Sequence, residues 1–245
     1  MFMKIIGHRG ARNEAPENTV QGFVHAFQNG CQHFELDIQL SADKQLIVYH
    51  DKSLRRTSGE NLKLNQQNFA FLSRMDSRLN TPGWHSECFI SRLEDIYHAV
   101  PDTQSWQFEV KTDRRDILNI VSEKLSAFID CHNLYEKCHV TSTNKWFLKA
   151  LKFKNPIINT GFVCEYLYQR PIKSCLAIGA SLIVLKYSLA SHRISRLAKR
   201  NGIEVSCWTV NSIEAIDTLL EMGVKSIITD EPTRMLQHYK KLVSD

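Results

Sequence analysis

Apolar and polar residues alternate along the chain in two patterns, one typical of strands and one typical of helices. Residues 4–7 contain two adjacent isoleucines and predict a short strand, and residues 20–27 repeat apolar side chains at the spacing of one helix face. Strict alternation over residues 33–40 (HFELDIQL) predicts a strand with two different faces. A polar tip then leads into residues 46–51 (LIVYHD), which predicts a hairpin.

The alternation becomes regular after residue 90. Residues 51–90 have weak periodicity and predict an irregular insertion. Helices are predicted at 93–100 and 117–129, and a last one from Pro232. Strands are predicted at 106–110, 139–141, 157–162, 182–186, 204–210 and 226–229. With residues 33–51 counted as one step, the chain has eight β/α steps, which favours a closed barrel over an open sheet.

The fold class predicted is therefore α/β, a single (β/α)₈ TIM barrel with a small insertion after the second strand. A length of 245 residues suits one such barrel without a linker, so we expect residues 1–245 to form one domain. Hydrophobic residues make up 43% of the chain, which is enough for a buried core.

The charge pattern narrows the class of partner. The formal net charge is +5, and the lysines and arginines are scattered rather than clustered. This distribution does not predict a nucleic-acid-binding surface. A mild positive field suits an anionic small-molecule substrate instead.

The cysteines and the hydropathy of the chain indicate where in the cell the protein is expected. The seven cysteines form no C-x-x-C pair, which predicts free thiols in a reducing compartment. We expect no signal peptide, because only two apolar residues follow Lys4 before the polar residues begin. The longest apolar stretch, residues 176–185, is too short to span a bilayer. We therefore expect a cytoplasmic protein without stable membrane anchoring, either a monomer or a homodimer.

Acidic residues gather where a barrel would place its functional groups, at the carboxyl ends of the strands. Glu35 and Asp37 share one face of the second strand, and Glu109 lies near the end of the third. Three carboxylates facing one another must share a proton or bind a cation. Ligation by oxygen alone favours Mg²⁺ or Ca²⁺ over zinc. A solvent-facing role is disfavoured, since a strand in a closed barrel has no solvent-facing side.

Two of the ten histidines end strands on the same side as these carboxylates. His8 follows the first strand, and His50 ends the hairpin strand. Such a pair can serve as general acid and general base, and Arg9 can hold a phosphate oxygen. His85 lies in the irregular insertion and has no predicted position. The remaining histidines are expected at the surface or at caps: His25, His33, His98, His132, His139, His192 and His238.

Eight short motifs occur in a fixed order. They are HRG at 8–10, PENT at 16–19, ELD at 35–37, HD at 50–51, RTSG at 56–59, EVK at 109–111, WTVN at 208–211 and TDEP at 229–232. Each motif is weak by itself, but together they span the chain and resemble the glycerophosphodiester phosphodiesterase family, in its cytoplasmic bacterial type.

The resemblance implies a function and a set of site residues. It implies metal-dependent hydrolysis of glycerophosphodiesters, small-molecule substrates, to glycerol 3-phosphate and an alcohol. It also implies a barrel with one divalent cation, Mg²⁺ or Ca²⁺, on Glu35, Asp37 and Glu109, and His8 and His50 as the catalytic pair. The substrate-binding residues implied are Arg9, Lys111, Trp208 and Glu17.

Two alternatives stay open. One is a lysophospholipase D acting on a lipid substrate, which would need an exposed apolar rim. The insertion carries the apolar candidates for that rim, although core packing is the favoured explanation for them: Phe69, Phe71, Leu72, Trp84 and Phe89. The other is an inactive barrel that serves as a binding module. The segment TSTN, residues 141–144, lacks the aromatic residue that family members often carry there, which predicts a permissive alcohol pocket around Thr143.

Overall fold

The computed structural model describes residues 3–111 and 115–242. Within these ranges, eight parallel strands close into a barrel. They are β1 (Lys4–His8), β2 (His33–Leu40), β5 (Ser105–Val110), β6 (Cys138–Ser142), β7 (Thr160–Cys164), β8 (Leu182–Lys186), β9 (Glu204–Trp208) and β10 (Ser226–Thr229). Because β1 pairs with both β10 and β2, the sheet has no open edge there, and the predicted (β/α)₈ barrel is confirmed.

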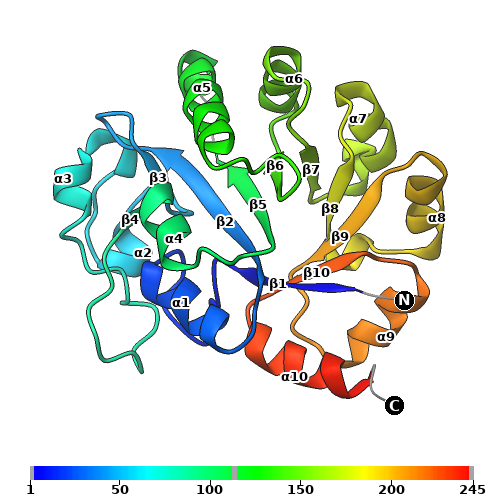
Figure 1. The fold of residues 1–245 in the computed structure, drawn as a ribbon, viewed down its shortest axis with the longest axis horizontal. Helices are drawn as coiled ribbons and strands as arrows, with labels where there is room; N and C mark the ends of the chain where they lie inside the picture. Colours follow the sequence, from blue (N-terminus) through cyan, green and yellow to red (C-terminus); the bar gives the residue numbers. More distant parts are fainter. Residues whose placement is uncertain (1–2, 112–114, 243–245) are drawn as a thin grey trace.

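Helices surround the barrel as a ring (Figure 1). They are α1 (Val20–Gln28), α4 (Leu93–Ala99), α5 (Arg115–Cys131), α6 (Lys145–Lys154), α7 (Pro171–Ile178), α8 (His192–Arg200), α9 (Glu214–Glu221) and α10 (Pro232–Leu242). Short 3₁₀ turns, η2 (Leu167–Gln169) and η3 (Tyr187–Leu189), follow β7 and β8. Among the described residues, we find no helix with the length and apolar character needed to cross a membrane.

Alternation along the strands divides the apolar core into two parts. Outward-facing side chains pack against the helices; Phe34 of β2, for example, lies 5.2 Å from Phe23 of α1 and 5.6 Å from Trp106 of β5, measured between ring centroids. Burying each such side chain contributes about 1.5–3 kcal/mol. A smaller inner cluster consists of Ile6, Val163, Leu182, Val184 and Ile228. The inner cluster supports the polar residues at the carboxyl ends of the strands.

The insertion lies at one flank of the barrel (left in Figure 1). Two short strands, β3 (Leu46–Val48) and β4 (Ser91–Arg92), extend the sheet beyond β2 in antiparallel pairing. Between them lie α2 (Arg55–Ser58), η1 (Leu64–Gln66) and α3 (Phe69–Leu72). The insertion has its own buried cluster of Ile47, Tyr49, Leu54, Leu64, Leu72 and Ile90. It is therefore more ordered than the weak periodicity of residues 51–90 predicts.

The predicted start of β7 is wrong by three residues. Ile157 and Ile158 look like the beginning of a strand, but Ile157 is 68% exposed and β7 begins at Thr160. An apolar pair at a helix-to-strand turn gives the same sequence signal as a strand end, because only one of the two residues needs to be buried.

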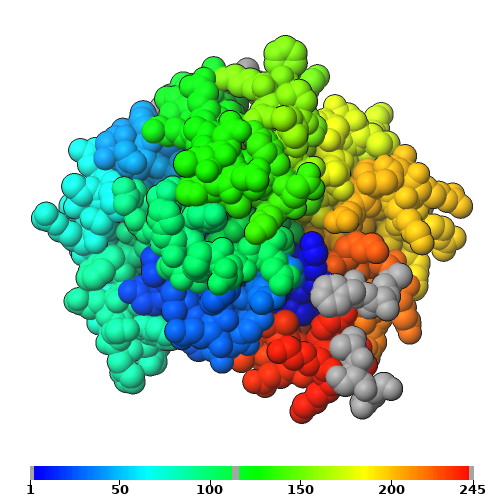
Figure 2. Space-filling model, in the orientation of Figure 1, coloured from blue at the N-terminus to red at the C-terminus, as the bar shows by residue number. Residues whose placement is uncertain are grey.

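The first and last segments of the described chain lie side by side. Figure 2 shows the blue N-terminal and red C-terminal regions in contact on one face. The backbone N–H of Met3 donates to the Tyr239 hydroxyl of α10 at 2.7 Å, and β1 is hydrogen-bonded to β10. The two ends of the sequence thus complete one barrel.

Candidate active site

Strand register brings acidic and histidine side chains together at the carboxyl end of the barrel. His8 is the last residue of β1 and pairs with Glu35 of β2. Two positions further along β2, Asp37 pairs with Glu109 of β5. The alternation of β2 points Glu35 and Asp37 to the same side, away from the apolar residues that face the helices.

The carboxylates of Glu35, Asp37 and Glu109 form one cluster. Each offers an oxygen, and the three oxygens lie within 4.8 Å of one another. Glu35 and Asp37 are buried, with exposed fractions of 3% and 1%. Burial, together with the charges of Asp37 and Glu109, raises the pKa of Glu35 well above its ordinary value. Glu35 Oε1 accepts no hydrogen bond from the described residues, so the cluster has an unsatisfied acceptor.

Two basic side chains neutralise part of this negative charge. Lys111 Nζ lies 2.6 Å from Glu109 Oε1 and 3.3 Å from Asp37 Oδ1. Arg9 Nε lies 3.0 Å from Asp37 Oδ2. Burial alone would raise the pKa of Asp37, but these two cations hold that pKa below its ordinary value. Asp37 is therefore charged, and Glu35 is the carboxyl with the least compensation.

The imidazole of His8 is held through its Nδ1 atom. Its Nδ1 lies 2.5 Å from Asp230 Oδ1, and its Nε2 lies 3.8 Å from Glu35 Oε2. Asp230 is held in turn by Asn211, whose Nδ2 donates to Asp230 Oδ2 at 2.9 Å. Burial lowers the pKa of His8, and the hydrogen bond to Asp230 offsets this only in part. The strand-end motifs WTVN and TDEP contain Asn211 and Asp230, but their role in orienting His8 is visible only in the closed barrel.

His50 has a similar carboxylate partner. Its Nδ1 lies 2.6 Å from Asp51 Oδ1, and Asp51 Oδ2 accepts from Arg56 Nε at 2.6 Å. The His50 side chain is 32% exposed, against 8% for His8. Both histidines therefore use Nδ1 for an aspartate and present Nε2, as expected when a second residue fixes the imidazole tautomer.

Gln39 holds the backbone on which His50 sits. Its Nε2 lies within 3.0 Å of three carbonyl oxygens, those of Tyr49, His50 and Asp51. Gln39 follows Asp37 by two positions on the same face of β2. The sequence analysis assigned it no role, although its place in the alternating face of β2 was the available signal.

Glu17 is the centre of a buried ion-pair network. Its carboxylate accepts from Arg9 Nη1 at 2.8 Å, from Arg56 Nη1 and Nη2 at 2.6 and 2.8 Å, and from Asn80 Nδ2 at 3.0 Å. Burial opposes ionisation, but the bonds and charges of Arg56 and Arg9 lower the pKa of Glu17 to about 2. Glu17 therefore positions two arginines, one from the first loop and one from the insertion.

The loop that carries Glu17 packs directly on α1. Gly22 allows this approach, because a Cβ there would lie only 2.3 Å from the Pro16 carbonyl oxygen. At the end of the same loop, Asn18 Nδ2 donates to Asp37 Oδ2 at 2.9 Å. The small residue in α1 thus lets the PENT segment reach the carboxylate cluster.

Aromatic residues lie beside the polar site. Trp208 ends β9 and packs against the inner cluster that contains Ile6 and Ile228. Its buried Nε1 donates no hydrogen bond within the described part of the chain. Thr143 is exposed, and Trp146 at the start of α6 is 69% exposed as well. The sequence analysis missed Trp146 because it lies beyond the segment compared, residues 141–144.

A protein-family model matches most of the chain. The Glycerophosphoryl diester phosphodiesterase family matches the chain over residues 8–234, which include every site residue described above.

Individual relatives are similar over nearly the full length. A glycerophosphodiester phosphodiesterase of Caldanaerobacter subterraneus is 25% identical over 97% of this chain and 98% of its own. The human lysophospholipase D GDPD1 is 23% identical over 95% of this chain and 84% of its own. An Oleispira antarctica phosphodiesterase, solved with the product sn-glycerol-3-phosphate, superposes with a TM-score of 0.89 at 20% identity, covering 98% of this chain and 97% of that one.

Proposed function

Because the chain belongs to the glycerophosphoryl diester phosphodiesterase family and is a phosphoric diester hydrolase, we propose that it converts glycerophosphodiesters to glycerol 3-phosphate and an alcohol. The observation that carries the proposal is the buried cluster of Glu35, Asp37 and Glu109 beside an oriented histidine. The product bound to the Oleispira antarctica relative supports a small glycerophosphodiester as substrate.

Glu35, Asp37 and Glu109 would hold one divalent cation. The three carboxylates offer oxygens within 4.8 Å of one another, and one of these side chains has an oxygen that accepts no hydrogen bond from the described residues. Carboxylates this close repel one another, and a cation between them would remove the repulsion. An all-oxygen donor set favours Mg²⁺ or Ca²⁺. A cation held there would supply positive charge to offset the negative charge that develops on the phosphate during cleavage.

His8 and His50 would act as the acid–base pair. Each presents Nε2 while an aspartate engages Nδ1, so each can accept or donate a proton at a defined atom. One of them removes a proton from the nucleophile, and the other gives a proton to the leaving alcohol. The nucleophile is either the glycerol 2-hydroxyl, which yields a cyclic phosphate that water then opens, or water itself.

The remaining site residues would bind the substrate. Arg9 uses Nη1 and Nε on carboxylates, which leaves its outer edge for a phosphate oxygen. Lys111 lies between Glu109 and Asp37 and would add positive charge for a phosphate oxygen. Trp208 offers an apolar surface for the glycerol carbons, and Glu17 holds Arg9 in place.

A coupled assay for glycerol 3-phosphate tests the proposal. Glycerophosphocholine, glycerophosphoethanolamine and glycerophosphoglycerol should each release glycerol 3-phosphate, and a chelator should abolish the release. Readdition of Mg²⁺ or Ca²⁺ should restore it and identify the preferred ion. Full activity after exhaustive chelation would contradict the cation site, whereas release of glycerol instead of glycerol 3-phosphate would contradict the proposed bond cleavage.

A lysophospholipid is the second candidate substrate, favoured by an aromatic rim at the carboxyl end of the barrel. The rim consists of exposed side chains in the segments that follow β6, β7 and β8: Trp146, Tyr166, Leu167, Tyr168 and Tyr187. Tyrosine and tryptophan suit the interface between water and lipid. The insertion contributes less to such a rim, since Leu72 is buried, although Phe71 and Phe89 are 41% and 38% exposed.

Two matched variants test the lipid candidate. Tyr168 is 78% exposed on the rim, whereas Phe153 is 89% exposed near the end of α6, at the opposite end of the barrel. If lysophospholipids are substrates, Tyr168→Ser should lower activity on lysophospholipid in vesicles and spare glycerophosphocholine, and Phe153→Ser should affect neither. Equal activity of both variants on vesicles would remove the rim from the proposal.

The wider organisation of the protein also stays a proposal. Residues 1–245 would form one domain, supported by the contact between Met3 and Tyr239 that joins the ends of the described chain. A cytoplasmic location is supported by the seven cysteines, which are all unpaired. A monomer or a homodimer without stable membrane anchoring is compatible with a small-molecule substrate.

A further inference from the structure

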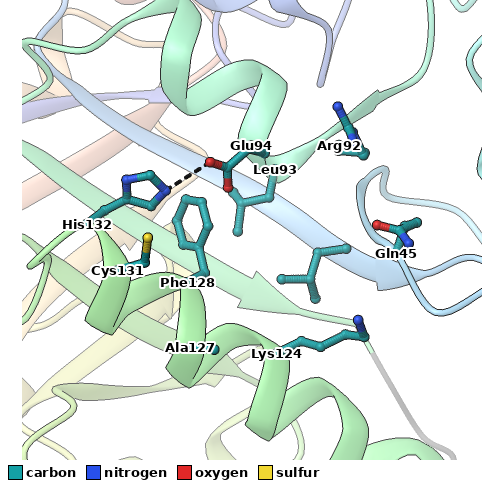
Figure 3. A pocket seen from close by; sticks show the side chains of 10 residues that line it. Gln45, Arg92, Leu93, Glu94, Lys124, Ala127, Phe128, Cys131 and His132 are labelled. Carbon is teal, nitrogen blue, oxygen red and sulfur yellow. Dashed lines mark hydrogen bonds and ion pairs between the residues drawn. The ribbon is translucent and has the colours of Figure 1, made fainter.

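A second group of metal-ligand side chains lies outside the barrel, on α4 and at the end of α5. Glu94 and His98 are four residues apart on α4, and His132 directly follows α5. Figure 3 shows Glu94 and His132 pointing toward each other across the gap between these helices. The sequence analysis placed His98 and His132 at the surface or at caps, because their proximity depends on how two helices pack.

Both imidazoles approach the same carboxylate oxygen. Glu94 Oε1 lies 3.0 Å from His132 Nε2 and 3.4 Å from His98 Nε2, and all three ligand atoms lie within 4.8 Å of one another. Zinc ligands at about 2.0–2.1 Å in tetrahedral geometry are separated from each other by about 3.3–3.4 Å. The spacing of these three atoms therefore needs little change to enclose a zinc ion.

The donor chemistry separates this group from the carboxylates inside the barrel. Two imidazole nitrogens and one carboxylate oxygen suit Zn²⁺ and related late first-row ions, whereas Mg²⁺ and Ca²⁺ prefer oxygen alone. A simple ion pair explains the arrangement less well. One protonated histidine would satisfy Glu94, but here two histidines converge on a single oxygen of that side chain.

The most buried ligand is held rigidly and the others remain accessible. The His132 ring lies 4.2 Å from the Tyr97 ring and 4.6 Å from the Phe128 ring, measured between centroids. The His132 side chain is 14% exposed, whereas those of Glu94 and His98 are 41% and 64% exposed. Glu94 and His132 also line a cavity of about 350 Å³, which has room for a water molecule as a further ligand.

We propose that Glu94, His98 and His132 bind one Zn²⁺ ion, independently of the cation site inside the barrel. The ion links α4 to the end of α5 across 38 positions of sequence. An ion that binds the folded chain more tightly than the unfolded chain raises the melting temperature. Zinc at this site therefore stabilises the outer helix layer and takes no part in phosphodiester cleavage.

Calorimetry with Zn²⁺ tests the proposal when other zinc ligands are controlled. Cys131 is exposed beside the site, so the titrations use the Cys131→Ser background to remove its thiol. Glu109→Gln is added to weaken the oxygen site. This protein should bind one Zn²⁺, and a further His132→Gln or His98→Gln change should weaken binding at least tenfold. His192→Gln, at an exposed histidine on α8, is the matched control and should bind as tightly as the background.

Thermal unfolding provides the second readout. Zn²⁺ should raise the melting temperature of the background protein and of His192→Gln, but should leave His98→Gln unchanged. His98 is the most exposed of the three ligands, and its substitution leaves the contacts of His132 with Tyr97 and Phe128 in place. Zinc binding that is absent in the background protein, or that survives both histidine substitutions, would overturn the proposal.

Discussion

The Nδ1 atom of His8 lies 2.5 Å from the Oδ1 atom of Asp230, although 222 positions separate the two residues in the chain. His8 ends the first strand of the barrel, and Asp230 directly follows the last. The pairing of β1 with β10 therefore orients the imidazole, and closure of the barrel is a condition for presenting Nε2 toward the carboxylates.

Asp230→Asn should lower kcat by about 10- to 100-fold, the usual cost of losing a residue that orients a functional group. An amide at this position can donate to Nδ1 and so stabilise the other imidazole tautomer, in which Nε2 carries the proton and has no free lone pair. When Asp230→Asn is combined with His8→Ala, kcat should fall little below that of His8→Ala alone, because Asp230 acts through His8. An independent, multiplicative loss in the double variant, measured by steady-state kinetics, would show a separate role for Asp230.

His8→Ala and His50→Ala should each lower kcat by about 10²-fold or more, the usual contribution of a general acid or base. The double variant should be little worse than the poorer single variant, since the two residues act as a unit. Near-normal activity of either single variant would argue against the pair.

The leaving group distinguishes the two histidines. A glycerophosphodiester with a p-nitrophenol leaving group needs little protonation of that group. The variant that lacks the general acid should therefore recover most of its activity on this substrate, while the variant that lacks the general base should not. Equal recovery of both variants would contradict the division of roles.

Glu109→Gln should weaken binding of the divalent cation at the barrel mouth by at least about tenfold, because it removes one of three anionic ligands. Titration calorimetry with Mg²⁺ and Ca²⁺ measures the effect. Glu123→Gln supplies the matched control, since Glu123 is 70% exposed on α5 and pairs with Lys154. Unchanged affinity in Glu109→Gln would remove Glu109 from the ligand set.

Glu17 should make stability depend on pH below about pH 5. Its folded-state pKa is about 2, below the ordinary value of 4.5, so the unfolded chain binds the proton more readily. The stabilisation is complete above the ordinary value and is lost as pH falls from 4.5 toward 2. At pH 7 the protein should have a larger free energy of unfolding than Glu17→Gln, and this difference should shrink by about 3 kcal/mol across that window. Denaturant unfolding at pH 7, 5, 4, 3 and 2 measures it, and a constant difference would contradict the ion-pair network.

Selectivity should lie on the glycerophosphate side of the substrate. A pocket discriminates strongly only where it hydrogen-bonds or tightly packs a group, and Thr143 offers the alcohol a small exposed side chain. Glycerophosphocholine, glycerophosphoethanolamine and glycerophosphoglycerol should therefore have kcat/KM values within about tenfold of one another, or about 1.4 kcal/mol. Bis(p-nitrophenyl) phosphate, which has no glycerol, should be much poorer. A preference of several orders of magnitude for one headgroup would point to Trp146 or the insertion as the selective element.

Local patterns predicted the barrel and part of its site. The strict alternation of β2 places Glu35 and Asp37 on one face, and the eight β/α steps place that face inside a closed sheet. These inferences need only the spacing at which apolar and polar residues recur along the chain. Boundaries were less predictable, as the exposed Ile157 before β7 shows, because burial is decided by the neighbouring elements.

Contacts between distant elements were beyond the sequence. The bond from Asn211 to Asp230 joins the ends of two neighbouring strands, and the bonds from Arg56 to Glu17 join the insertion to the first loop. The pattern of apolar and polar residues along the chain indicates neither contact. The pairing of His132 with Glu94 likewise requires the packing of α5 against α4.

The three carbonyl contacts of Gln39 divide the chain into a part that must be kept and a part that can be redesigned. They fix residues 49–51 from β2, directly before the insertion begins. The position of His50 is thus set by strand β2 of the barrel and not by the segment that follows His50. Changes of length or composition within residues 60–90 must therefore retain Asn80 for Glu17 and the three buried residues Leu64, Leu72 and Ile90, and Arg56 must stay for Asp51 and Glu17. The exposed part of the insertion is therefore the segment in which substrate preference can be altered while the position of His50 is kept.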